Sequence, residues 1–310
     1  MKKRNIVVSI ICAVLCCAGV TVIFQRYQSW TNQAFDKLAA QNIKAYSDSQ
    51  NTEVTARVEN VRTTLKTIAE MVQQREESGG GTQDLKDYFN AVSKNEDIQA
   101  EGVRYYRFDS IDTSVMSEND LKMIEQLKKG ESVVSDIFPS ENENGTALYY
   151  GIAEPIFVDG KAEGFIRGLI SSDTLLYSSQ TGFMRTDTES FLMYEDGTNA
   201  FTENLSEERG PYVNMYDSLE NIGGSPDQVR ELKENIKEKK QKVMIFMKGK
   251  EPVYVSYSFL PYNGWIILNV FYSADMNEYV VTLEDNGKKM TALLIGLAAV
   301  ILLLVAGIVY

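Results

Sequence analysis

The sequence predicts an α+β protein with a transmembrane helix at each end, a long helix after the first span, and two antiparallel-sheet modules in tandem. Three observations lead to this prediction. Both ends of the 310-residue chain are apolar runs. A stretch without glycine or proline follows the first run, and one order of strands, turns and helices then occurs twice.

The terminal runs are residues 5–24 and 290–310, and neither contains a charged residue. A bilayer core about 30 Å thick needs roughly 20 helical residues to cross it, so both runs are predicted to be transmembrane helices. The alternative for either run is a buried core helix, and for the first run also a cleaved secretory signal.

The orientation follows from the basic residues Lys2, Lys3 and Arg4, which precede the first run. Positive charge stays on the cytoplasmic side, so residues 1–4 are expected inside the cell and residues 25–289 outside it. Lys288 and Lys289 argue more weakly for the opposite orientation. We therefore expect a two-pass protein of the cell membrane whose central region is extracytoplasmic.

Composition excludes several classes of chemistry. The three cysteines all lie in the first apolar run, so disulfides cannot hold residues 25–289 together. The chain has no histidine, which removes Ser-His-Asp and Cys-His catalysis and histidine metal sites. The net charge of −12 opposes binding to nucleic acid. We expect no catalytic residues, no metal and no cofactor.

The stretch after the first run predicts a stalk helix over residues 25–78. Its second half carries apolar residues at alternating steps of four and three, the seam of a heptad repeat. The seam residues are Val54, Val58, Val61, Leu65, Ile68 and Val72. Two interpretations stay open, because such a stripe packs either on its own domain or on a second copy in a parallel homodimer.

The first module is predicted over residues 79–176. The expected helices are 85–92 and 121–127, and the expected strands are 101–108, 133–138, 147–158 and 162–170, all rich in β-branched and aromatic residues. Asp159 and Gly160 between the last two strands are a strong signal for a hairpin turn.

The second module is predicted over residues 177–280 and repeats this order. Its expected strands are 190–194, 242–247, 253–259 and 265–271, its turn is Asp196-Gly197, and its helix is 226–240. A strand, a turn, a helix and then three antiparallel strands thus occur in both modules. This order predicts two curved sheets, each with helices on one face.

Three stretches of the chain resemble the double Cache family of extracytoplasmic sensor domains, which are related to the PAS fold. Residues 150–170, YGIAEPIFVDGKAEGFIRGLI, are similar to the family's central strands and D-G-K turn. Residues 191–198, FLMYEDGT, resemble the opening strand and turn of its membrane-proximal module, and residues 255–271, VSYSFLPYNGWIILNVF, its closing hairpin. The resemblance covers nearly all of residues 25–289.

The resemblance implies a sensor of small molecules without enzymatic activity of its own. It also implies a cytoplasmic output domain beyond residue 310, with a diguanylate cyclase favoured over a histidine kinase or a chemoreceptor domain. Amino-acid-binding members carry an Arg-x-Trp-Tyr run and an aspartate at the end of one strand. The run is absent here and Leu169 occupies the place of the aspartate, which argues against an amino-acid ligand.

The candidate ligand-binding residues are Arg104, Tyr106, Tyr149 and Arg167, which lie on the predicted central strands of the first module. An arginine can hold a carboxylate through its planar set of donors, and a tyrosine can stack on a ligand. The structural alternatives are that Arg167 pairs with Glu154, that Arg104 faces water and that both tyrosines fill the core.

The sequence therefore favours the ligand-sensing input region of a bacterial signalling protein. The alternative is a membrane-anchored binding or scaffold protein without an output domain. An exported enzyme is a third class, which the absence of histidine and of paired acids disfavours.

Overall fold

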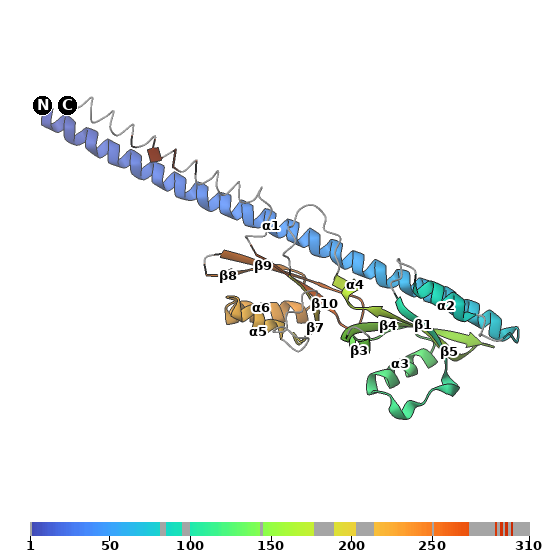
Figure 1. The fold of residues 1–310 in the computed structure, drawn as a ribbon. Coiled ribbons are helices and arrows are strands. Elements are labelled where there is room, and N and C mark those ends of the chain that lie inside the picture. The colour runs from blue at the N-terminus through green and yellow to red at the C-terminus, as the bar shows by residue number, and fades with distance from the viewer. Residues whose placement is uncertain are drawn as a thin grey trace. The chain divides into compact units, whose positions relative to one another are not determined.

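The computed structural model describes residues 2–80, 85–94, 100–142, 145–176, 189–202, 214–249 and 251–272, with six single positions between 289 and 299. The chain divides into two compact units. The first comprises residues 1–43, 180–187 and 272–310, and the second comprises residues 44–179 and 188–271. The first unit contains the N-terminal part of α1, and both sheets belong to the second (Figure 1).

Helix α1 (Lys2–Glu77) runs without a break for 76 residues. The predicted first span and the predicted stalk are therefore one continuous helix. The helix ends at Glu77, two residues before Gly79, which adopts a φ of 74° that glycine reaches without steric cost.

The prediction of two transmembrane helices is wrong for the part of the chain that the structure describes. No helix there is both long and apolar enough to cross a membrane. Most of the second predicted span, 290–310, lies outside the described residues.

The first sheet has five antiparallel strands: β1 (Ala100–Arg107), β2 (Val133–Val134), β3 (Phe138–Asn142), β4 (Gly145–Val158) and β5 (Lys161–Ser171). Their order is β1-β5-β4-β2, and β3 also pairs with β4. The predicted turn between β4 and β5 is present, with positive φ at both Asp159 and Gly160. The helical elements of this module are α2 (Lys86–Ser93), short 3-10 turns at Phe108–Ser110 and Thr113–Val115, α3 (Glu118–Lys128) and α4 (Asp173–Leu176).

The second sheet also has five antiparallel strands: β6 (Glu189–Met193), β7 (Asn199–Thr202), β8 (Val243–Lys248), β9 (Glu251–Phe259) and β10 (Ile266–Tyr272). Their order is β7-β6-β10-β9-β8. In both sheets the first strand pairs with the last, and the last pairs with the strand before it. The repeated order in the sequence thus corresponds to a repeated topology.

Two helices, α5 (Met215–Asn221) and α6 (Pro226–Lys237), lie beside the second sheet (Figure 1). Helix α6 begins with a capping box, in which the Ser225 hydroxyl accepts from the backbone N–H of Gln228 and the Gln228 side chain accepts from the Ser225 N–H. Its apolar stripe, Val229, Leu232 and Ile236, is buried. The Gln228 side chain also donates to the carbonyl of Ile245 on β8, 2.8 Å away.

The heptad seam of α1 lies in the core of the chain itself. All six seam residues are at most 2% exposed and share one apolar cluster with strand residues such as Ile152 and Ile166. A side chain at Gly168 of β5 would come within 3.2 Å of Leu65, so glycine at this position allows the helix to approach the strand. The seam thus packs on the chain's own domain, which is the first of the two interpretations. Its buried side chains are not available to a second copy.

One turn earlier, α1 contacts the second sheet through a buried polar network. The Asn269 side chain of β10 donates to Gln50 at 2.8 Å and to Ser47 at 3.2 Å, and it accepts from Ser190 of β6 at 2.6 Å. Ser47 is also hydrogen-bonded to Ser256 of β9 at 2.5 Å. All five residues are at most 4% exposed, so these groups satisfy one another in place of water.

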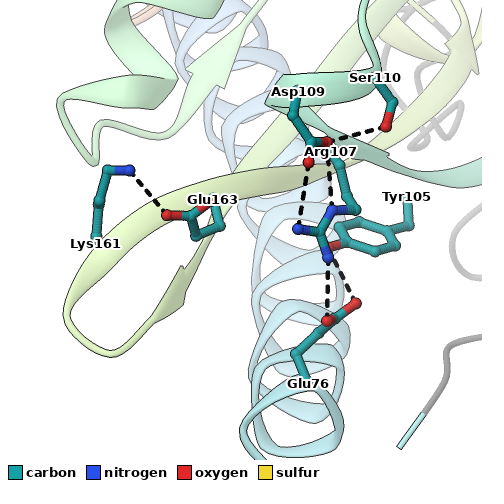
Figure 2. Close-up of polar contacts among 7 residues, drawn as sticks. All are labelled: Glu76, Tyr105, Arg107, Asp109, Ser110, Lys161 and Glu163. Carbon is teal, nitrogen blue, oxygen red and sulfur yellow. Dashed lines mark hydrogen bonds and ion pairs between the residues drawn. The ribbon is translucent and has the colours of Figure 1, made fainter. Parts of the chain in front are cut away.

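The C-terminal end of α1 is bound to β1 by charged groups (Figure 2). Arg107 pairs with Glu76 of α1 and with Asp109, both at 3.3 Å. The Tyr105 hydroxyl donates to Glu76, and burial together with the Glu76 charge raises the pKa of Tyr105 to about 12. The hydrogen bonds from Ser110 and Arg107 hold the pKa of Asp109 below its ordinary value.

Candidate ligand-binding site

Side chains alternate between the two faces of the first sheet along each strand. A different helix packs on each face. Helix α1 packs on the face that carries Ile152 and Ile166, whereas α3 packs on the other. Met123 and Leu127 of α3 form a small apolar cluster with Ala153 and Phe165 on that second face. We call this second face the α3 face.

The four residues singled out in the sequence all lie on the α3 face. Arg104 of β1 is directly opposite Arg167 of β5, and Tyr106 is directly opposite Phe165. Tyr149 of β4 is opposite Ser171 and Phe138, which belong to the same face.

Their surroundings differ. The Arg104 side chain is exposed. Tyr106 stacks on Phe165 with ring centroids 5.1 Å apart, beside the apolar cluster under α3. Tyr149 is 3% exposed and therefore belongs to the core. Arg167 lines a cavity beside α3.

This cavity has a volume of about 390 Å³ and lies between the N-terminal half of α3, the segment from β2 to β3, and the α3 face. We call it the α3 cavity. Volumes of this size are typical of sites for small molecules. Besides Arg167, its polar lining includes Ser117, Asp120, Ser135, Asp136 and Asn263.

The guanidinium of Arg167 lies over the ring of Phe138, with Cζ 5.3 Å from the ring centroid. Its Nε is buried, and no described residue accepts a hydrogen bond from it. A side chain at Gly151 would approach this Nε to 2.7 Å, so the absence of one lets the guanidinium lie against β4. A buried donor without an acceptor is unfavourable by roughly 1–3 kcal/mol, and an anion in the cavity would remove this penalty.

The alternative partner for Arg167, Glu154, is on the other face of the sheet. Glu154 is opposite Ile166 in the register between β4 and β5. Its carboxylate accepts from Arg62 of α1 at 3.1 Å and from Ser132 at 2.5 Å. Burial lowers the pKa of Arg62, but the hydrogen bonds and charges of Glu154 and Glu59 outweigh that effect and hold the pKa above its ordinary value. Glu154 thus binds α1 to the sheet and leaves Arg167 without a carboxylate among the described residues.

Sequence reasoning did not single out the two carboxylates that line the cavity. Asp120 accepts from the Ser117 hydroxyl at 2.6 Å near the start of α3. Asp136 accepts from the Tyr194 hydroxyl at 3.3 Å. Burial and the Asp136 charge raise the pKa of Tyr194 to about 12, so the hydroxyl stays protonated as a donor near neutral pH. The cavity therefore offers the Arg167 guanidinium and the Lys122 ammonium, which also pairs with Glu118, for an anionic group, and two carboxylates for a cationic group.

Metal chemistry has no support in the described ranges. No group of three or more His, Cys, Asp or Glu side chains is arranged there to hold an ion.

Structures determined by experiment share this fold. The periplasmic sensory domain of the Campylobacter jejuni chemoreceptor Tlp1 matches with a TM-score of 0.52 and 13% identity, over 78% of this chain and 97% of that domain. A structure described as methyl-accepting chemotaxis protein X matches with a TM-score of 0.53 and 12% identity, over 76% and 98%. The extracellular domain of the putative histidine kinase rpHK1S-Z16 matches with a TM-score of 0.52 and 11% identity, over 78% and 96%.

No protein-family model and no curated protein matches the chain. The resemblance to the Cache type of sensor domain is confirmed at the level of the fold, which is that of sensory domains from chemoreceptors and histidine kinases.

Proposed function

We propose that this chain is the ligand-sensing input region of a signalling protein, and that it binds a small organic anion in the α3 cavity. The observation that carries the proposal is Arg167, which lines the cavity and whose buried Nε has no acceptor among the described residues. The shared fold of sensory domains supports the sensing role.

A carboxylate is the anionic group that this geometry favours. The planar guanidinium presents donors along its edge, and a carboxylate accepts from two of them at once. The ring of Phe138 covers one face of the guanidinium and holds its plane. A ligand carboxylate would therefore approach along the edge of the guanidinium and accept from Nε.

A second group on the ligand would meet Asp120 or Asp136, which line the same cavity. Both carboxylates are suited to an ammonium group, although Leu169 replaces the aspartate on which the resembling amino-acid sensors depend. An α-amino acid and the matching carboxylic acid without its amine therefore form an informative pair of ligands.

The proposal also includes the cellular location of the chain and its output domain. We place it outside the cytoplasm, because similar folds are named as periplasmic or extracellular domains. A diguanylate cyclase as output remains a prediction from the family resemblance. Reading the coding sequence beyond residue 310 distinguishes this input region from a binding protein without an output domain.

A thermal-shift screen of the full chain tests the ligand. The panel holds amino acids, the matching carboxylic acids, dicarboxylates, and amines without a carboxylate. A ligand at 100 times its Kd stabilises the folded state by about 2.7 kcal/mol, and we expect such an increase in Tm with at least one carboxylate. A panel in which only the amines raise the Tm would contradict the proposal.

A matched pair of variants tests the residue. Arg167→Leu should abolish the increase in Tm, because it removes the guanidinium that the proposal assigns to the ligand carboxylate. Arg104→Leu removes the same charge from the same face, but at an exposed position outside the cavity lining, so it should retain the increase. Loss of the increase in both variants would indicate a general effect of charge and contradict the assignment of Arg167.

A further inference from the structure

The turn between β9 and β10 extends from the second sheet to the first. This turn, residues 262–265, is closed by a hydrogen bond from the Trp265 N–H to the Tyr262 carbonyl at 2.8 Å. Asn263 and Gly264 have φ values of 47° and 69°, the conformation in which an Asn-Gly pair forms a tight hairpin turn. The short turn fixes the direction in which the Asn263 side chain projects.

Asn263 is part of the wall of the α3 cavity, although it belongs to the second sheet. Its side-chain amide donates to the carbonyl of Ser135 at 3.0 Å. Asn263 also lines a second cavity of about 430 Å³ beside Trp265 and the end of α6. One side chain thus borders a cavity in each module.

Ser135 continues the chain of contacts to Arg167. Its N–H donates to the Gly151 carbonyl and its hydroxyl accepts from the Gly151 N–H, both at 2.7 Å. A side chain at Gly151 would meet both the Ser135 hydroxyl and the Arg167 guanidinium. A continuous set of contacts therefore joins Arg167 to Asn263 through Gly151 and Ser135. A ligand that binds Arg167 would act at one end of this set.

Two further contacts join the second module to the residues beside Ser135 and Gly151. The Tyr194 hydroxyl from the second module donates to Asp136, the neighbour of Ser135. The indole of Trp265 meets the ring of Tyr150, the neighbour of Gly151, edge-on with centroids 6.1 Å apart. Trp265 is fully buried, so its fluorescence reports on the packing of this contact.

We propose that Asn263 is a binding-site residue that the second sheet contributes to the α3 cavity, and that it transmits the state of the cavity to the turn between β9 and β10. The inference rests on the proposed function for what occupies the cavity. The coupling itself is a property of the chain without ligand, because the contacts that form it are already present. Coupling through such contacts changes local opening equilibria by up to about tenfold.

The test changes a residue beside Arg167 in the first sheet and measures the response in the second sheet. Gly151→Ala adds a methyl group where the Arg167 Nε lies 2.7 Å away, so the guanidinium must move. In the full chain carrying Trp30→Phe, so that Trp265 is the only tryptophan, we expect a shifted emission maximum of Trp265. We also expect amide exchange at residues 264–268 to change about threefold or more.

The variant Asn263→Gly keeps the turn, because glycine adopts positive φ freely, and removes the side chain that contacts Ser135. In this background Gly151→Ala should change the emission and the exchange less, because, among the described contacts near the cavity, only those of Tyr150 and Tyr194 then join the two sheets. Asp159→Gly is the matched control, because Asp159 occupies the same kind of turn, with a φ of 52°, in the hairpin between β4 and β5. In the Asp159→Gly background the full response should remain.

Arg167→Leu is a second perturbation of the cavity in case Gly151→Ala lowers the amount of folded protein. No response at residues 264–268 to either variant would overturn the inference, and so would an equal response with and without the Asn263 side chain. Failure of every compound in the thermal-shift screen would instead count against the proposed ligand, since this test uses none.

Discussion

Along α1, the helix contacts the second sheet at Ser47 and Gln50 through buried hydrogen bonds, whereas from Val54 to Val72 its buried stripe is wholly apolar. Apolar packing is non-directional and contributes free energy in proportion to the area buried. A buried polar network stabilises only the arrangement in which every group has its partner. The comparison indicates that the apolar seam supplies stability and the polar network fixes the position of α1 along the second sheet.

The largest effect should follow from a cavity in the seam. Leu65→Ala removes a fully buried side chain that packs against Gly168, and we expect a loss of about 2–5 kcal/mol in the free energy of unfolding. Urea unfolding followed by circular dichroism measures it. Leu38→Ala is the control on the same helix, because Leu38 is 49% exposed and should change stability by less than about 0.5 kcal/mol. Equal losses in the two variants would contradict the conclusion that the apolar seam supplies the stability.

The network should give the next largest effect. Asn269→Ala removes the donor to the Gln50 side-chain oxygen and the acceptor of the Ser190 hydroxyl. We expect a loss of about 1–3 kcal/mol in the free energy of unfolding, measured in urea. Gln50→Leu alone should cause a loss of similar size. The double variant Gln50→Leu/Asn269→Ala removes both partners of one hydrogen bond, so its loss should be smaller than the sum of the single losses. A strictly additive result would show that these groups act independently.

The smallest effect concerns pH at the edge of the network. Burial raises the pKa of Asp48, but hydrogen bonds from Lys44 and Gln241 and the Lys44 charge outweigh it, so the pKa lies below the ordinary value of 3.8. Because the folded-state pKa is lowered, the stabilisation is present above that value and is lost as the pH falls through the folded-state pKa. The Asp48 side chain is 48% exposed, so the contribution is below about 1 kcal/mol. Asp48→Asn should therefore reduce the loss of stability in acid unfolding as the pH falls below the ordinary value of 3.8, and an unchanged pH dependence would contradict the assignment.

Much of the fold follows from local patterns. The turn at Asp159-Gly160 was predictable because its residues favour positive φ, and helix α6 because Pro226 and Gln228 follow Ser225 in a capping box. Strand β7 and helix α5 were missed, because a four-residue edge strand and a seven-residue helix carry too little periodicity. The seam shows a different limit, since a heptad pattern identifies an apolar stripe but not the surface that covers it.

The candidate site was predictable only in part. Alternation along β1 and β5 places Arg104 and Arg167 on one face, as strand periodicity requires, and the same alternation separates Glu154 from Arg167. What distinguishes Arg167 from Arg104 is the covering by α3 and by the segment after β2, which depends on tertiary packing. Asp136 and Asn263 carry no local signal of a binding role, because Asn263 reaches the cavity from a strand pair more than a hundred residues away in the sequence.

The most direct measurement of the central claim is the NMR signal of the arginine Nε–H groups in the full chain, recorded while the best carboxylate from the thermal-shift screen is added. If a ligand carboxylate accepts from the buried Nε of Arg167, one Nε–H signal should move with the ligand concentration. That signal should be absent from the Arg167→Lys variant and retained in Arg104→Lys. A ligand that raises the Tm while the Arg167 signal stays in place would show that the α3 cavity is not where the anion binds.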